Sequence, residues 1–451
     1  MRHRILLLAL LLPALAQSQS LLDRFSDKVK NRVDQKIDQG MDKGLDAAEG
    51  KAAEAARKDK TKAQPAAQPA ATAASPASTA APASTATATP AVAATPAAAF
   101  KAYSRYDFIP GAEIVYAEDF SQDVIGEFPL KWSTNNRGEA VTIQGLDGKW
   151  MQLFKEGHFV SPYIKKLPEN FTTEFDLVLH LPPNTQNTNY PEFVIRLMNV
   201  ETGDDRARKF FAGNFEAKTD VRLVLAPYPE EGSTLSIFSS EGGHNNVLFS
   251  QEGKDLRSMS GLIDKPIHVA IWVQKERFRL WINGDKIYDL PQAVPANAAF
   301  NRLAFETGSS PYTDNEVGYY ISNIRFAQGS ADLRSKLLTE GRLVTNGIHF
   351  DVSSDRIKPE SAGVLQEIAK VLQDNPSVKV KITGHTDSDG DAAKNLALSK
   401  QRAAAVRSAL AGMGVDASRL QTDGKGAGQP VADNASKEGK AKNRRVEFVK
   451  L

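Results

Sequence analysis

One loop of the sequence gathers the side chains that could do chemistry. It combines an imidazole with three carboxylates directly before a predicted helix: His385, Asp387, Asp389 and Asp391. On that helix, polar side chains follow at the spacing i, i+4 and i+7 and therefore share one face: Asn395, Ser399 and Arg402. Three kinds of site fit such a set, namely a metal site, a hydrolytic active site, or a polar cradle for a charged ligand.

A metal site and a nucleophilic site both lack residues that they require. A calcium loop of the EF-hand type that began at Asp387 would need glycine at its sixth position and glutamate at its twelfth, where Ala392 and Leu398 stand. A zinc site needs at least three converging ligands, and the other histidine of this segment, His349, is distant in sequence. Ser399 has no histidine in its own helix to activate it. We therefore expect no metal, no cofactor and no catalytic residue here.

A polar cradle needs one negative and one positive group on the same surface, which Asp387 and Arg402 provide. The carboxylate would take an ammonium group, and the guanidinium fork would take a carboxylate with two hydrogen bonds. Such a pair matches a zwitterion. The alternative is that Asp387 only complements the helix N-terminus and that Arg402 pairs with it internally.

The loop belongs to a C-terminal segment, residues 338–451, in which strand-like and helix-like patterns alternate. Pro359 favours the start of a first helix, whose apolar residues share one face: Val364, Leu365, Ile368 and Leu372. The second helix runs to about Gly412. Together with four predicted strands this indicates a small α/β domain of β-α-β-α-β-β order, with strands in GIHFDV, SVKVKITG, RLQTDGKG and NRRVEFVKL.

This segment resembles the C-terminal peptidoglycan-binding domain of the OmpA family. It contains the family elements GHTD-x-x-G, N-x-x-LS-x-x-RA-x-x-V, G-x-G and NRRVE in order and spacing. The resemblance implies that Asp387 and Arg402 hold the ammonium and carboxylate of diaminopimelate in the stem peptide of the cell wall. Thr386 and Asn395 would line the same pocket. Arg445 matches the basic pair of the family and would have either a ligand-binding or a structural role.

The middle segment, residues 100–329, shows the patterns of an all-β domain. Short alternating stretches are separated by polar loops, and Asn283-Gly284 is a strong hairpin signal. Many short antiparallel strands favour a two-sheet, jelly-roll-like sandwich. All tryptophans lie here and are expected in its core: Trp132, Trp150, Trp272 and Trp281.

The opening EDF, the hairpin RLWINGDKIYDL and the closing YYISNIRF resemble, weakly, the concanavalin-like lectin and glucanase sandwiches. Retaining glucanases of that fold need two carboxylates on one strand as nucleophile and acid. Glu174 and Asp176 fit the first two positions of that motif, but Val178 and Leu179 stand where the second glutamate belongs. We therefore predict no hydrolytic activity. A carbohydrate ligand and a spacer without a ligand both remain open.

The N-terminal third predicts export. Residues 1–16 have the basic start, apolar run and small-x-small end of a cleaved signal peptide. Residues 17–60 carry an apolar stripe typical of an amphipathic helix that contacts a protein partner or a membrane surface, or of a solvated helix. Residues 61–99, rich in Ala, Pro and Thr, predict a disordered linker. The chain has no cysteine to carry a lipid, and its net charge of +2 gives no indication of nucleic-acid binding.

These observations predict a non-enzymatic periplasmic protein of a Gram-negative envelope. It would bind peptidoglycan through its C-terminal domain, possess no metal or cofactor, and tether the β-sandwich at the wall, with attachment to the outer membrane left open. One alternative is a carbohydrate-active or sugar-binding protein that uses the last domain only as a wall anchor. Another is a structural adaptor in an envelope complex.

Overall fold

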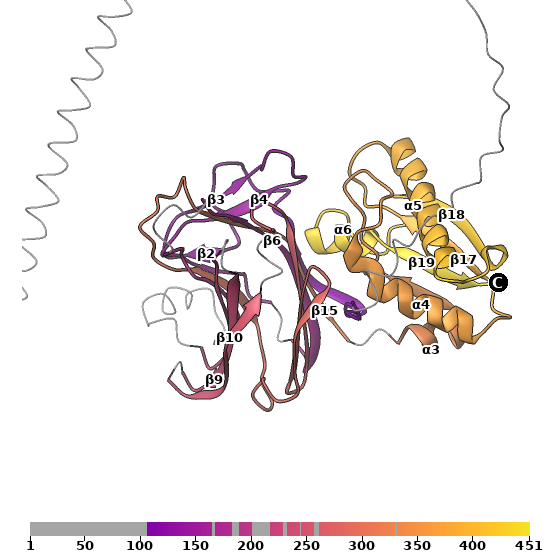
Figure 1. The fold of residues 1–451 in the computed structure, drawn as a ribbon. Coiled ribbons are helices and arrows are strands. Elements are labelled where there is room, and N and C mark those ends of the chain that lie inside the picture. Colours follow the sequence, from indigo (N-terminus) through magenta and orange to yellow (C-terminus); the bar gives the residue numbers. More distant parts are fainter. Residues whose placement is uncertain are drawn as a thin grey trace, which may run out of the picture. The chain divides into compact units, whose positions relative to one another are not determined.

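The computed structural model describes residues 106–164, 167–182, 189–200, 217–228, 232–243, 245–256, 261–329 and 332–451. The predicted signal peptide, amphipathic helix and linker lie outside these residues. Residues 93–451 belong to one compact unit, in which the described part has two lobes (Figure 1). We call residues 113–328 the β-lobe and residues 333–451 the C-terminal lobe. None of the helices described is both long and apolar enough to cross a membrane.

The β-lobe consists of two antiparallel sheets, with strands in sequence order as follows: β1 (Glu113–Glu118), β2 (Ser133–Thr134), β3 (Gly138–Val141), β4 (Trp150–Leu153), β5 (His158–Val160), β6 (Asn170–His180), β7 (Phe193–Asn199), β8 (Thr219–Ala226), β9 (Ser233–Glu241), β10 (Val247–Leu256), β11 (Ile267–Gln274), β12 (Arg277–Ile282), β13 (Asp285–Leu290), β14 (Arg302–Thr307) and β15 (Gly318–Gln328). The first sheet has the order β13-β12-β11-β6-β15-β4-β3, with β1 on β15. The second has the order β10-β9-β8-β7-β14-β5-β2.

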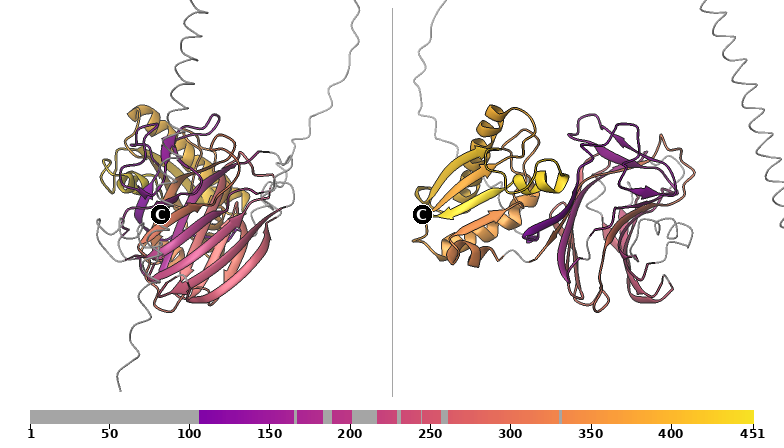
Figure 2. Two further views of the ribbon diagram at one scale, coloured as in Figure 1. Left: turned by 90° about the vertical axis from the view of Figure 1, so that its left-hand side faces the viewer. Right: turned by 180° about the vertical axis from the view of Figure 1, so that it is seen from behind.

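The two sheets face each other and share one apolar core (Figures 1 and 2). Side chains alternate along each strand, so Phe175 of β6 points inward and packs edge-on against Phe305 of β14, with ring centroids 5.1 Å apart. The mainly β character predicted for this segment is confirmed. Its jelly-roll connectivity and its likeness to concanavalin-like sandwiches stay predictions.

The predicted hairpin between β12 and β13 is confirmed by its turn. Asn283 and Gly284 have φ angles of 47° and 89°, and the type I′ turn requires positive φ at both central residues. The other predicted turn, Lys275-Glu276, connects β11 to β12. Both turns depend on local residues alone, which explains why the sequence predicts them.

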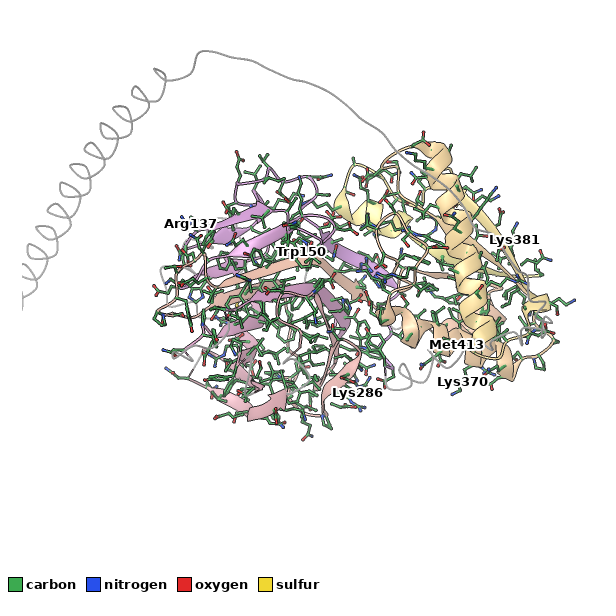
Figure 3. All side chains as sticks on the ribbon, turned by 45° about the horizontal axis from the view of Figure 1, so that its top comes forward. Arg137, Trp150, Lys286, Lys370, Lys381 and Met413 are labelled. Atoms are coloured by element: carbon green, nitrogen blue, oxygen red, sulfur yellow. The ribbon has the colours of Figure 1, made fainter. Side chains whose placement is uncertain are left out.

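The four tryptophans do not all lie in the core of the β-lobe. Trp132 does, whereas Trp281 is buried on the outer face of the first sheet against Phe108 and Ala362. Trp272 lies on the same outer face, is only partly buried, and stacks on the guanidinium of Arg279 at 4.8 Å. Trp150 is buried within the β-lobe (Figure 3). The prediction is therefore confirmed for Trp132 alone of the four. Trp150 and Trp281 are buried but lie outside the core between the sheets, and Trp272 is only partly buried.

The C-terminal lobe is a four-stranded sheet with helices, in the order α3 (Leu333–Leu338), β16 (Arg342–Thr345), α4 (Ala362–Asp374), β17 (Val380–His385), α5 (Ala392–Gly412), β18 (Leu420–Gly426), α6 (Lys437–Asn443) and β19 (Val446–Lys450). The sheet order is β16-β19-β17-β18, with β17 and β18 parallel and the other pairs antiparallel. The lobe contains the helices α3 and α6 beyond the predicted β-α-β-α-β-β pattern.

The predicted strand GIHFDV, residues 347–352, is wrong. The first strand of the lobe is β16, which pairs with β19, and in residues 347–352 only Phe350 forms a bridge, to Ile357. Gly347 is packed against Pro110, where an added Cβ would lie 2.6 Å from the proline ring. The apolar alternation of this stretch therefore reflects packing against a neighbouring segment and not membership of the sheet.

Helix α4 buries the predicted apolar face, which includes Val364, Leu365, Ile368 and Leu372. Helix α5 lies against β17 and β18 through three close approaches. A Cβ at Gly384 would lie 2.2 Å from the Ser399 carbonyl oxygen, and one at Gly424 would lie 2.4 Å from the Lys400 nitrogen. A Cβ at Gly426 would lie 2.9 Å from the Leu396 nitrogen. A residue with a Cβ would collide at each of these positions. The three glycines therefore allow α5 to pack directly on β17 and β18.

The segment Tyr106–Gly111 lies between the two lobes, with Tyr106, Phe108 and Pro110 buried and Asp107 exposed. Phe108 is fully buried and packs against Trp281 of the β-lobe, with ring centroids 5.2 Å apart. On its other side its carbonyl oxygen lies against Gly363, where a Cβ would be only 2.2 Å away. Ile109 packs against the core of the C-terminal lobe. The segment therefore fills the junction between the lobes.

A second junction lies where α6 packs on β1. Lys437 is buried and forms an ion pair with Glu118 and another with Asp123, the latter at 2.8 Å. Ala441 contacts Ile114 and Ala117 beside this pair. Since a buried ammonium needs a compensating charge, this contact fixes α6 on the β-lobe.

Gly384→Ala should destabilise the protein, because the new methyl group would collide with the backbone of α5. We expect the free energy of unfolding to fall by about 1 to 3 kcal/mol, the usual cost of overpacking, as measured by urea denaturation. Gly412→Ala is the matched control, because its Cβ meets nothing within 4 Å. Equal stability of Gly384→Ala and the parent protein would contradict the packing described here.

Candidate ligand-binding site

The three aspartates of the loop between β17 and α5 have three different roles. Asp391 caps α5 and accepts a hydrogen bond from the Lys394 backbone nitrogen at 2.9 Å. Asp389 pairs with Lys440 of α6 at 2.8 Å while its own side chain is 62% exposed. The loop therefore does not direct its carboxylates to one point. Among the residues described, no group of three His, Cys, Asp or Glu side chains could hold a metal ion.

Asp387 is the aspartate of this loop that lines the cavity from a buried position. Its Oδ1 accepts from the Asp389 backbone nitrogen at 3.1 Å, and its Oδ2 accepts from Nη1 of Arg444 at 2.6 Å. It neither caps α5 nor forms an ion pair with Arg402, so the alternative role considered for it does not describe this structure. These two hydrogen bonds hold the carboxylate in one orientation.

Arg402 is positioned by neutral groups. Its Nε donates to the Ser354 carbonyl at 2.9 Å and its Nη2 to the Asp351 carbonyl at 3.2 Å, while the guanidinium stacks on Phe350 at 4.8 Å. Burial lowers the pKa of Arg402, and the negative charge of Asp387 opposes that shift. The guanidinium thus lies within the electrostatic reach of Asp387, yet has no carboxylate hydrogen-bonded to it among the described residues.

Thr386, Asn395 and Ser399 hold the backbone of the site. The Thr386 hydroxyl donates to the Asp387 carbonyl at 2.8 Å, and Asn395 Nδ2 donates to the Asp389 carbonyl at 2.8 Å. Ser399 is fully buried and accepts from the Gly426 nitrogen at 2.9 Å. Thr386 and Asn395 also line the cavity. Their hydrogen bonds fix the loop that presents Asp387.

The two arginines of the basic pair, Arg444 and Arg445, have different contacts. Arg445 is buried, and its Nε donates to Glu447 at 2.9 Å. Arg444 instead contacts Asp387 and lies 3.9 Å from Asp119 of the β-lobe. Since side chains alternate along a strand, the spacing of Arg445 and Glu447 could have predicted their pairing, and with it the opposite placement of Arg444.

His385 is buried and has no hydrogen-bond partner for either ring nitrogen among the described residues. Burial lowers the pKa of His385 to about 4, and the charge of Arg445 acts in the same direction. The imidazole is therefore neutral at pH 7 and packs as part of the lobe.

A cavity of about 690 Å³ contains Asp387 and Arg402 and is lined by both lobes. The β-lobe contributes the outer face of its first sheet, at β6, β11 and β15. Glu174 and Asp176 of β6 lie there beside His268 of β11, whose Nδ1 is 2.8 Å from Asp176 Oδ1 and whose Nε2 is 3.5 Å from Glu174 Oε2. The carboxylates of Glu174 and Asp176 therefore both lie beside the imidazole of His268.

This cluster carries charge although it is buried. Burial favours neutral His268, but the hydrogen bond with Asp176 and the nearby carboxylate of Glu174 outweigh it and raise the pKa of His268 to about 10. Burial also disfavours the charged form of the two carboxylates, yet the adjacent His268 helps to lower the pKa of each to about 2. At pH 7 the cluster is therefore two carboxylates around one imidazolium.

Two further residues complete the wall. Arg325 of β15 lies 3.2 Å from Nε2 of His349 in the C-terminal lobe. Burial, followed by the charge of Arg325, lowers the pKa of His349 to about 3, so this imidazole is neutral. Between Ser322 and Arg325 the pairing of β15 with β6 is irregular, and Asn323, at φ 54°, donates to Asp176 at 2.8 Å. Irregularities of this kind commonly redirect a side chain.

Sequence reasoning missed His268, Arg325 and Arg444 as residues of this cavity. One signal was available for His268. In HVAIWV the inward positions are Val269, Ile271 and Val273, so the outward positions hold His, Ala and Trp, which is an unusual set for a solvated face. Arg325 gave no such signal, because its partner His349 comes from the other lobe.

Comparison with known proteins places the C-terminal lobe in a family. Residues 349–444 match the model described as "OmpA family", and this region is an OmpA-family domain. The chain is 43% identical over 144 residues to "Probable lipoprotein YiaD" of Escherichia coli, covering 30% of this chain and 64% of that protein. It is 39% identical over 120 residues to "Peptidoglycan-binding protein ArfA" of Mycobacterium bovis, covering 26% and 36%.

Among solved structures, the peptidoglycan-associated lipoprotein from Burkholderia pseudomallei is 34% identical and covers 23% of this chain and 88% of that one, with a TM-score of 0.22. The chain spans less than two thirds of the length of the two curated relatives named above, YiaD and ArfA.

The stability of the protein should fall between pH 6.5 and pH 9. Folded His268 keeps its proton up to a pKa of about 10, against 6.5 for the ordinary group, so its contribution is complete below pH 6.5 and is lost as pH rises toward 10. Urea denaturation midpoints across this range should decline less steeply for His268→Gln. His180→Gln, whose ring is 46% exposed, is the control and should keep the slope of the parent protein. An unchanged slope in His268→Gln would contradict a buried imidazolium.

Proposed function

We propose that the C-terminal lobe binds peptidoglycan without a covalent bond, by holding the zwitterionic end of diaminopimelate between Asp387 and Arg402. One observation carries this proposal. The two side chains have opposite charge and line the same cavity, yet each is held by its own partners and not by the other. Such an arrangement keeps both charges available to a ligand that has the complementary pair.

The geometry assigns a role to each charge. Asp387 accepts the ammonium group, in a position that Arg444 now approaches from one side. Arg402 donates to the carboxylate. Its Nε and Nη2 are used by carbonyls, and Nη1 has no hydrogen-bond partner among the described residues. Because Ser354 and Phe350 already fix the guanidinium, less side-chain freedom is lost when the ligand binds.

The family match supports this proposal. Residues 349–444 contain both proposed ligand-binding residues, and one relative of known name, ArfA, is called peptidoglycan-binding. By the same reasoning we place the protein in the periplasm, associated with the cell wall, with residues 21–60 as the segment that would contact the outer membrane or a protein partner. Nothing in the buried pairing of Arg445 with Glu447 favours a direct ligand contact, so we assign Arg445 a structural role.

We propose further that the protein is not an enzyme and that the wall lobe retains the β-lobe at the envelope. Val178 lies on the outer face of β6, where a glucanase would carry its second glutamate, and both it and Leu179 are buried. Glu174 and Asp176 share His268, so both remain ionised and neither can serve as the protonated acid that glycoside hydrolysis needs. A carbohydrate ligand of the β-lobe is the alternative.

Asp387→Ala and Arg402→Ala should each weaken binding to purified sacculi at least about tenfold, since a charge-assisted contact contributes roughly 1.5 to 3 kcal/mol. The measurement is co-sedimentation of the full chain with sacculi across a concentration series. Thermal unfolding should accompany it, because Arg402 also anchors the segment around Ser354.

Asp389→Ala is the matched control. Its carboxylate lies two residues from Asp387 but is mostly exposed and paired with Lys440, and exposed pairs contribute little. Binding should persist in this variant and in the presence of a chelator. Retention of Asp387→Ala and Arg402→Ala on sacculi, or release of the parent protein by chelator, would rule out the cradle.

The protein should release no reducing ends from β-glucans or from sacculi, because Glu174 and Asp176, the two carboxylates at the glucanase positions, both stay ionised and neither can act as the acid. A reducing-sugar assay over many hours checks this. Turnover that disappears in Glu174→Gln would show that the protein is an enzyme.

A further inference from the structure

The wall of the cavity that the β-lobe provides contains a buried carboxylate oxygen without a partner. Glu174 is 3% exposed and lines the cavity, and its Oε1 has no hydrogen-bond partner among the described residues. The other oxygen, Oε2, lies 3.5 Å from His268 Nε2 and 3.7 Å from His349 Nε2. A buried, ionised acceptor without a donor costs free energy, and a donor from a ligand in the cavity would recover it.

The neighbouring carboxylate, Asp176, is already satisfied. Its Oδ1 is bound by His268 and its Oδ2 by Asn323, each at 2.8 Å. Lys358, from the C-terminal lobe, lies 3.9 Å from Asp176 and 3.7 Å from Glu360, too far for hydrogen bonds. This part of the cavity therefore offers Glu174 as an acceptor and Lys358 as a cation.

The same cavity continues to the proposed zwitterion site. Arg444 connects the two walls, since it lies 2.6 Å from Asp387 and 3.9 Å from Asp119 of the β-lobe. A volume of about 690 Å³ is typical of sites for ligands much larger than the end of one amino acid. A ligand that is held at Asp387 and Arg402 thus has room to extend along the β-lobe.

We propose that the β-lobe recognises the peptide next to diaminopimelate in the stem peptide, with Glu174 accepting a hydrogen bond from a peptide N–H and Lys358 donating to a carbonyl or carboxylate. This inference rests on the proposed function and deepens it, because it makes the binding site a joint product of the two lobes. A peptide fits better than a sugar ring. Apart from histidines, the aromatic side chain in the described lining is Phe350, and the Arg402 guanidinium already covers it.

The test compares two ligands on the full chain by isothermal titration calorimetry: free diaminopimelate, and a stem tripeptide that ends in diaminopimelate. The parent protein should bind the tripeptide more tightly. Glu174→Ala should weaken tripeptide binding about tenfold and leave the affinity for free diaminopimelate unchanged. Glu174→Gln keeps the side-chain volume and one acceptor oxygen, so it should fold and show the same pattern with a smaller loss.

Two variants separate the possible failures. Glu252→Gln, on the exposed strand β10 of the other sheet, should affect neither ligand. Arg402→Ala should lose both ligands. Suppose that Arg402→Ala loses both ligands, while both Glu174 variants keep the ratio of the two affinities that the parent protein shows, or lower both affinities alike. The proposed role of Glu174 is then wrong, and the proposed function stands. If Arg402→Ala binds both ligands like the parent protein, the proposed function and this inference fail together.

Discussion

Charge buried on the outer face of the first sheet is the constraint on which the arrangement of the two lobes depends. Glu174, Asp176 and Arg325 project from strands whose opposite face packs the core of the β-lobe. Ions removed from water are tolerated only with partners of opposite charge or with hydrogen bonds. His268 supplies one such partner from the same sheet. From the C-terminal lobe, Lys358 brings a positive charge near Asp176, and neutral His349 forms a hydrogen bond with Arg325. The C-terminal lobe therefore helps to stabilise charges that are buried on the β-lobe.

Packing supports the same arrangement. Phe108 lies between Trp281 and Gly363, and Lys437 reaches from α6 to Glu118 and Asp123. Removing one partner of a buried ion pair costs far more than an exposed pair contributes. The contacts at these two junctions therefore favour one orientation, in which the loop of Asp387 and the outer face of the first sheet line one cavity.

Sequence patterns predicted features that depend on neighbours in the chain. The Asn283-Gly284 turn and the apolar face of α4 both follow from local geometry. The failures came from contacts between distant segments. Residues 347–352 alternate like a strand but are packed beside Pro110, and Trp281 covers the outside of a sheet because Phe108 comes to lie on it. Asp387 and Arg402 could be selected from the family motifs, whereas Arg325 required the second lobe to be in place.

The separation of Asp387 from Arg402 explains why a zwitterion suits the cavity better than a simple ion. Had the two paired, a ligand would have had to break that ion pair before binding. Instead Arg402 is oriented by the neutral carbonyls of Ser354 and Asp351, so a ligand carboxylate would be its first hydrogen-bonded anion. A lone anion would gain this contact but meet the negative charge of Asp387 across the cavity. A lone cation would meet Arg402 and Arg444. A ligand that carries both charges satisfies each group and leaves the net charge of the cavity unchanged, which limits the desolvation cost of binding.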